Sequence, residues 1–168
     1  MNIAINKTQH VPIRYVPKNI TKKDREKQLK SLRKSRKLYK KHKYFTRPKI
    51  KSFKTKRSRH LEHAYEMYNV DSMKPTPQLS KATKCNIETL EKIINKGEGA
   101  YFSSGSRPSQ TAQSWGYARL ASALTGGNSS IVDLHLLKEG CSKNSKALTL
   151  ALKTCKKQNK CKETKNQN

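Results

Sequence analysis

The chain has 168 residues, of which 38 are Lys or Arg and 11 are Asp or Glu, so its formal net charge is +27. Apolar residues make up 33% of the chain, below the roughly 45–50% of a typical globular domain, which excludes one large core along its whole length. No stretch approaches the roughly 18 uncharged apolar residues of a membrane span, and we expect no secretory signal at the N-terminus.

The positive charge is concentrated in the first part of the chain. Residues 27–61 contain 16 Lys or Arg and no acidic residue. Coulomb repulsion keeps such a segment open when it is alone, whereas a polyanion neutralises it and releases counterions. The charge therefore indicates a polyanionic partner, but it does not distinguish nucleic acid from an anionic membrane surface.

A basic helix is predicted near the start of this region. Thr21 is a suitable N-cap, and Asp24 three residues later favours the first turn. We expect the helix to run from Lys22 to about Lys41. Its apolar stripe is thin and consists of Leu29, Leu32, Leu38 and Tyr39.

Residues 42–57 interleave aromatic and cationic side chains, and we call them the basic-aromatic strip. Pro48 prevents a helix there, so the strip is expected to be extended. A second helix is predicted from Ser58, because Leu61, Ala64, Tyr65 and Tyr68 recur at helical spacing.

Residues 76–96 predict a pair of short helices similar to a helix-turn-helix. Thr76 and Pro77 form an N-terminal signal for a helix to about Lys84, and Asn86 caps a second helix that Gly97 is expected to end. Lys84 occupies the turn, where a positive φ makes glycine usual. Glu88 and Glu91 on the second helix would repel phosphate, so a hairpin used only for packing is the leading interpretation.

The rest of the chain also has helical patterns. We expect a loop over 97–110, a helix over 111–124, a helix or buried strand over 131–138, and a last helix over 145–157 capped by Asn144. The fold class is therefore mainly α: a basic, partly extended arm (1–59), a compact helical domain (60–157) that contains the helix-turn-helix-like pair, and a disordered polar tail (158–168).

Three groups of residues are candidates for binding. Tyr44 and Phe53 could stack on bases, although anchoring the arm to a core is the alternative. Ser104, Ser106 and Arg107 form a possible anion loop, although Arg107 could instead pair with Asp133 or Glu139. The polyanion-binding set is Arg33, Lys34, Arg36, Lys37, Lys40, Lys41, Arg47, Lys49, Lys51, Lys54, Lys56 and Arg57.

Catalytic and metal-binding patterns were not found. The histidines form no ligand set, and we interpret His135 as structural. The four cysteines contain no CxxC pair, so free thiols are the default expectation. A disulfide between Cys155 and Cys161, or between Cys141 and Cys155, is the alternative and requires an oxidising route.

Three segments resemble an uncharacterised domain family of large nucleocytoplasmic DNA viruses, including chlorella-virus-like and mimivirus-like groups. They are RYVP (14–17), KSRKLYKKHKYFTRPKIKSFKTKRS (34–58) and GAYFSSGSRPSQTAQSWGYARLASALTGG (99–127). The resemblance covers roughly residues 14–150. It implies a viral protein that is carried in the particle, and a viral thiol-oxidation route that favours a disulfide, but it transfers no activity or catalytic residue.

Together these observations predict a non-enzymatic virion protein without a cofactor or a small-molecule substrate. Its arm would bind viral DNA, and its helical domain would bind other virion proteins. The alternative is a minor capsid protein that cements capsomers under the shell by contacting acidic capsid surfaces or the inner membrane. The expected location is the virion, and the host cytoplasm or virus factory during assembly.

Overall fold

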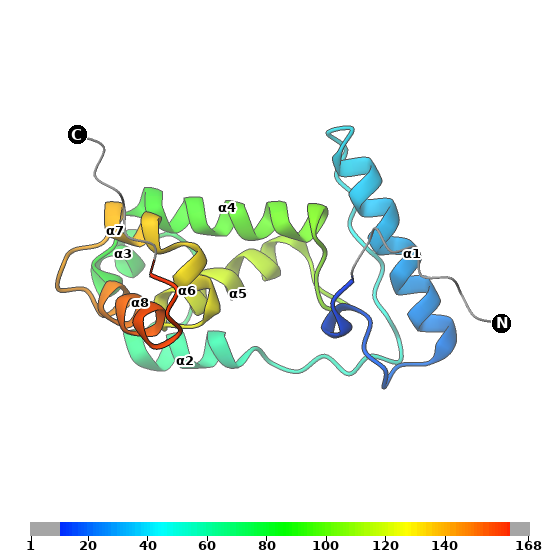
Figure 1. Ribbon diagram of the computed structural model, residues 1–168, viewed down its shortest axis with the longest axis horizontal. Helices are drawn as coiled ribbons and strands as arrows, with labels where there is room; N and C mark the ends of the chain where they lie inside the picture. The colour runs from blue at the N-terminus through cyan, green and yellow to red at the C-terminus, as the bar shows by residue number, and fades with distance from the viewer. Residues whose placement is uncertain (1–10, 162–168) are drawn as a thin grey trace. The chain divides into compact units, whose positions relative to one another are not determined.

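The computed structural model describes residues 11–161, and within that range the protein is mainly helical, as the sequence predicts. The described part contains no strand, only an isolated bridge between Cys85 and Cys141. The elements, drawn in Figure 1, are η1 (Ile13–Tyr15), α1 (Lys22–Tyr39), α2 (Arg59–Tyr68), α3 (Pro77–Thr83), α4 (Ile87–Ser103), α5 (Ala112–Leu124), α6 (Asn128–Val132), α7 (Leu134–Gly140) and α8 (Lys146–Lys157).

The chain divides into two compact units. The basic unit consists of Met1–Thr55 together with Ala100–Thr111, and the helical unit consists of Lys56–Gly99 together with Ala112–Asn168. The basic unit thus combines residues of the expected arm (1–59) with a segment from much later in the chain, which the sequence pattern assigns to the helical domain. Residues 162–168 of the expected tail lie outside the described residues.

Local capping signals define where several helices begin. The Thr76 hydroxyl accepts a hydrogen bond from the Leu79 amide at 3.3 Å, and Pro77 occupies the first turn of α3. The Asn86 side chain accepts from the Thr89 amide at 2.8 Å at the start of α4. Both predicted caps are confirmed. The cap of α8 is Ser145, one residue after the expected Asn144.

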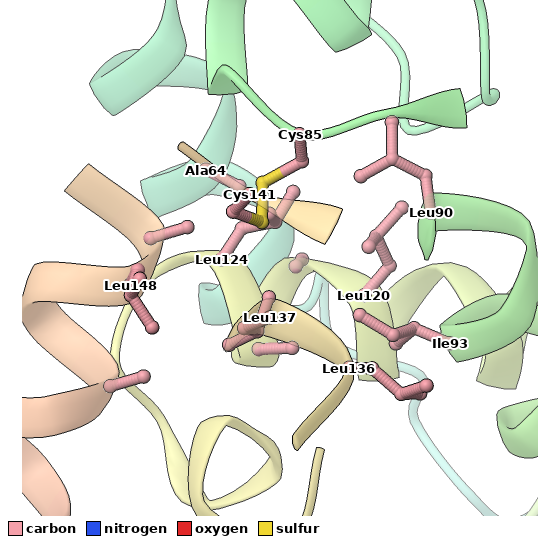
Figure 2. Close-up of a cluster of buried hydrophobic side chains, with 14 of the residues drawn as sticks. Ala64, Cys85, Leu90, Ile93, Leu120, Leu124, Leu136, Leu137, Cys141 and Leu148 are labelled. Atoms are coloured by element: carbon pink, nitrogen blue, oxygen red, sulfur yellow. A yellow bond between two sulfur atoms is a disulfide. The ribbon is translucent and has the colours of Figure 1, made fainter. Parts of the chain in front are cut away.

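The core of the helical unit is built from the apolar faces of α2, α3, α4, α5, α7 and α8. Figure 2 shows the side chains of this core gathered around the Cys85–Cys141 disulfide. Tyr68 adds one polar group, because its hydroxyl donates to the Leu124 carbonyl at 2.5 Å, and burial raises the pKa of that phenol. The fully buried residues include Ala64, Leu79, Leu90, Ile93, Leu120, Leu124, Leu137 and Ala151.

The expected end of α4 at Gly97 is wrong, because the helix continues to Ser103. A Cβ atom on Gly97 would lie 2.7 Å from the Gly116 Cα of α5, and one on Gly116 would lie 2.8 Å from the Ile94 carbonyl oxygen. Both glycines therefore allow α4 and α5 to cross closely, which is a tertiary role rather than a local stop signal.

The region after α5 also differs from expectation. Residues 131–137 do not form a strand, and the helix expected over 131–138 is divided into α6 and α7 at Asp133. The Asp133 carboxylate is fully buried and accepts two hydrogen bonds from the Arg119 guanidinium, at 2.9 and 2.8 Å. The Lys96 ammonium lies 3.6 Å from the same carboxylate. Arg119 and Lys96 thus hold the acid that was considered as a partner of Arg107.

The turn between α3 and α4 places Lys84 at a position where glycine is usual. Lys84 has φ 56° and ψ 33°, a left-handed conformation in a residue other than glycine. Its carbonyl accepts from the Ser142 amide, and the Gly140 carbonyl accepts from the Asn86 amide, each at 2.8 Å. These two hydrogen bonds flank the Cys85–Cys141 disulfide, so the turn is tied to the end of α7.

The free-thiol expectation is wrong, because all four cysteines form disulfides. The Cys155–Cys161 alternative is confirmed, whereas Cys141 pairs with Cys85 rather than with Cys155. The missed pair joins residues 56 positions apart, and nothing in their spacing indicates it.

We predict that Asp133→Ala destabilises the helical unit by about 3–5 kcal/mol, because it leaves the Arg119 guanidinium without its buried partner. Thermal unfolding followed by circular dichroism measures the loss. The matched control is Glu88→Ala, which removes an exposed carboxylate 2.8 Å from Lys92 on α4 and should change stability little. Equal effects of the two changes would contradict the structural role assigned to Asp133.

The two disulfides should differ in their contribution to stability. In the chain-entropy model a cross-link across 56 residues stabilises by about 4 kcal/mol, and one across 6 residues by about 2 kcal/mol. Replacing Cys85 and Cys141 together by Ala should therefore lower the unfolding midpoint more than replacing Cys155 and Cys161. Denaturant unfolding of the two double variants checks this order, and the reverse order would refute it.

Candidate polyanion-binding surface

Helix α1 has a buried face that is polar rather than apolar. Its buried residues are Gln28, Ser31, Leu32 and Ser35, at the spacing of one helix face. The expected stripe is thus correct at Leu32, while Leu29, Leu38 and Tyr39 are only half-buried. Gly105 packs over Leu32 with φ +107°, and a Cβ there would lie 2.7 Å from a Leu32 methyl.

The start of α1 is tied to the basic-aromatic strip. The Thr21 hydroxyl caps the helix by accepting from the Asp24 amide at 3.3 Å, as predicted. The Asp24 carboxylate accepts from the amide of Ser52 at 2.9 Å and from its hydroxyl at 2.5 Å. The hydroxyl hydrogen bond, followed by the amide one, lowers the pKa of Asp24. The carboxylate therefore ties the strip to the first turn of α1, and its negative charge also interacts with Lys23 and Lys27.

Arg47 lies inside the basic unit, with 5% of its surface exposed. Its guanidinium donates to the Ser35 hydroxyl at 3.1 Å, to the Tyr101 carbonyl at 2.7 Å and to the Ser106 hydroxyl at 2.7 Å. The guanidinium carbon also lies 3.8 Å from the centre of the Tyr101 ring. Among the described residues no carboxylate pairs with it, and burial lowers its pKa.

Arg47 therefore belongs to the interior and not to the surface set in which the sequence placed it. Its backbone amide donates to the Tyr101 hydroxyl at 2.9 Å, which holds the strip against the end of α4. Farther along the strip, Ile50 is buried, and its amide donates to the Ser109 hydroxyl at 3.0 Å. These contacts fold the strip onto residues 100–111.

The proposed anion loop is partly used by the same contacts. Ser106 is fully buried, accepts from Arg47, and donates to the Arg107 carbonyl at 2.8 Å. The Ser104 carbonyl accepts from the half-buried Arg36 guanidinium at 2.8 Å. Only Ser104 and Arg107 of the three candidates are exposed, so the loop serves mainly to secure α1 and the strip.

The remaining cations of the predicted set lie on the surface. Lys56 and Arg57 are exposed in the helical unit, where Arg57 lies 3.7 Å from Glu62. The basic unit exposes Arg33, Lys34, Lys37, Lys40, Lys41, Lys49, Lys51 and Lys54. It also exposes cations on α1 and the strip that the sequence-based set omitted, namely Lys22, Lys23, Arg25, Lys27, Lys30 and Lys43.

The two candidate stacking residues occupy different environments. Tyr44 is 72% exposed, whereas Phe53 is half-buried. The neighbouring Phe45 ring is covered by the Lys34 ammonium, which lies 4.4 Å from the ring centre. Tyr44 is thus the aromatic side chain of the strip that is most open to a partner.

Residues 11–161 contain no group of three His, Cys, Asp or Glu side chains placed to hold a metal ion. In the same range no helix has the length and apolar character needed to cross a membrane. The basic unit has 19 Lys or Arg against Asp24 and Glu26 over residues 11–55 and 100–111, so its surface attracts anions.

We predict that Arg47→Met unfolds the basic unit or loosens it severely, because Ser35, Ser106 and the Tyr101 carbonyl all lose a hydrogen-bond partner. Ser35 and Ser106 still donate to the Phe102 and Arg107 carbonyls, so the loss consists of the hydrogen bonds from the guanidinium, each worth about 1.5–3 kcal/mol because the donor is charged. Amide hydrogen exchange over α1 and the strip measures the effect. Lys49→Met, which removes an exposed charge two residues away, should leave the exchange unchanged. Similar protection in both variants would contradict the role of Arg47.

Comparisons with known proteins give one result that bears on identity. Among curated proteins and among solved structures, no match was found. A family model described as a family of unknown function (DUF5824) matches residues 12–134, which is most of the chain. The matched segment contains α1 to α6 in full, and thus Arg47, Ser106 and the exposed cations of α1. The chain therefore belongs to this family of unknown function, DUF5824.

Proposed function

We propose that this is a non-enzymatic, virion-associated protein that binds a polyanion, viral DNA in particular, through its basic unit. The observation that carries the proposal is the exposed array of Lys and Arg on α1 and the strip, which far outnumbers Asp24 and Glu26, the two acids of the described basic unit. Of the two acids in the described basic unit, Asp24 is bonded to Ser52. A phosphate backbone supplies the missing negative charge.

The folding of the basic unit supports a preformed binding surface. Arg47 fixes the strip against α1 and the end of α4, so the exposed cations are held on a structured support. Binding then orders less chain than it would with an unfolded arm, which lowers the entropic cost of association.

The helical unit is proposed to contact other virion proteins. Lys84 joins α3 to α4 in a left-handed conformation, and α4 exposes Glu88 and Glu91, of which Glu88 pairs with Lys92 at 2.8 Å. Two carboxylates on the helix that would face DNA repel phosphate. We therefore propose that the α3–α4 pair serves packing or protein contact rather than base reading.

The viral setting rests on the resemblance of residues 14–17, 34–58 and 99–127 to proteins of large DNA viruses. The two disulfides support it, because they require an oxidising route during maturation. The proposed location is the virion, with assembly in the host cytoplasm or a virus factory.

The second candidate is a minor capsid protein that cements capsomers under the shell. The observation favouring it is that the basic unit is itself folded, so it could occupy a fixed position against acidic capsid surfaces or the inner membrane. Copies in a capsid role would follow the symmetry of the shell in a particle reconstruction, whereas copies bound to the genome would not.

We predict that affinity for duplex DNA falls steeply with salt and depends on α1. Replacing Arg33, Lys37, Lys40 and Lys41 together by Gln removes up to four phosphate contacts, each worth roughly 0.9 in the slope of log affinity against log salt. Fluorescence anisotropy of a labelled duplex at several salt concentrations measures the slope.

The matched control removes the same number of exposed charges from the helical unit by replacing Lys81, Lys146, Lys153 and Lys156 with Gln. Its slope should remain close to that of the unaltered protein. Equal losses in both variants would show that net charge alone drives binding, and a flat salt response would refute the DNA proposal in favour of the capsid role.

A further inference from the structure

We infer that the basic unit binds unpaired bases of a single-stranded nucleic acid on an aromatic cluster formed by Tyr39, Tyr44 and Phe102. This inference rests on the proposed function and specifies the form of nucleic acid that the basic unit prefers.

The three rings come from separate parts of the basic unit. The Tyr39 ring is stacked with that of Phe102, with centroids 6.3 Å apart and planes 9° apart. The Tyr44 ring is tilted against both, 5.1 Å from Phe102 and 6.2 Å from Tyr39. They lie at the end of α1, in the strip and at the end of α4, so the fold builds this cluster from distant sequence.

The turn after α1 brings Tyr44 back to Tyr39. His42 adopts a left-handed conformation with φ 57°. The Leu38 carbonyl accepts from the amides of Lys41 and Lys43, and the Tyr39 carbonyl accepts from the His42 amide, all at 2.9 Å. These bonds complete the end of the helix and reverse the chain.

Phe102 is held in place by α1 and by Tyr101. The Ser35 hydroxyl donates to its carbonyl at 3.1 Å, and the Tyr101 ring meets its ring edge-on with centroids 5.0 Å apart. Tyr101 is itself fully buried against Arg47. The cluster is therefore rigid before any ligand arrives, which is the property that a stacking platform needs.

The exposure of Tyr44 and the charges next to it indicate which class of ligand the aromatic cluster binds. Tyr44 is 72% exposed although its ring belongs to an aromatic cluster, and the adjacent Lys40, Lys41 and Lys43 are exposed. A single strand offers flat base faces and phosphates together, which matches this combination. A duplex keeps its bases stacked within the helix, and an acidic protein surface offers charge without base faces.

The test compares strands that have the same phosphates with and without bases. A 20-nucleotide oligothymidylate and an abasic strand of equal length carry the same charge, so their difference in affinity reports base contacts. Anisotropy should show that the protein binds the oligothymidylate roughly 5- to 150-fold more tightly, the range expected for one stacked base. An oligouridylate tested in parallel distinguishes RNA from DNA as the source of the bases.

Variants of Tyr44 localise the effect. Tyr44→Leu should reduce oligothymidylate affinity to the abasic level and leave abasic affinity unchanged, whereas Tyr44→Phe should retain the preference. In Tyr44→Trp, the added tryptophan emission should be quenched by oligothymidylate and not by the abasic strand. Ile13→Ala, at another exposed apolar residue of the basic unit (70% exposed), is the control and should change neither affinity.

The outcomes distinguish base stacking on the aromatic cluster from polyanion binding by the basic unit. Equal, salt-dependent affinity for the basic and abasic strands would overturn base stacking and leave polyanion binding intact. A base preference that persists in Tyr44→Leu would also overturn the inference. Failure to bind any strand or duplex would overturn the proposed function and the inference together.

Discussion

The fold of the basic unit depends on one buried guanidinium. Arg47 donates to Ser35, Ser106 and the Tyr101 carbonyl and lies over the Tyr101 ring, so it joins α1, the basic-aromatic strip and the segment 100–111. A buried charge is costly unless hydrogen bonds and polarisable groups surround it. Hydrogen-bond acceptors and the Tyr101 ring surround Arg47 in this way, which explains why the basic unit can fold although it has few apolar residues.

The same contact links structure to charge. The partners of Arg47 are hydroxyls, a carbonyl and an aromatic face, so no carboxylate among the described residues neutralises it. Asp24 hydrogen-bonds Ser52 and remains ionised next to Lys23 and Lys27. With 19 Lys or Arg against two acids over residues 11–55 and 100–111, the basic unit still keeps a large positive excess.

Features set by local chemistry could be predicted from the sequence. The caps at Thr21, Thr76 and Asn86 need only a side-chain oxygen and an amide three residues later. Features set by distant contacts could not. Gly97 is a stop signal in isolation, and only the crossing with α5 explains why α4 continues through it.

The candidate site shows the same division. The cationic run itself predicted which region is charged, and most of its members lie on the surface. Composition could not reveal that Arg47 is buried, because what distinguishes it from Lys49 is its contact with Tyr101 and Ser106, more than fifty residues away. The aromatic cluster could not be predicted either, because Phe102 lies far in sequence from Tyr39 and Tyr44.

The disulfide of Cys85 also links distant parts of the chain. Its partner, Cys141, lies beyond residue 134, where the family match ends. A fragment restricted to the matched segment would carry Cys85 as an unpaired thiol in place of a closed covalent ring, and two such fragments could cross-link to each other under oxidising conditions.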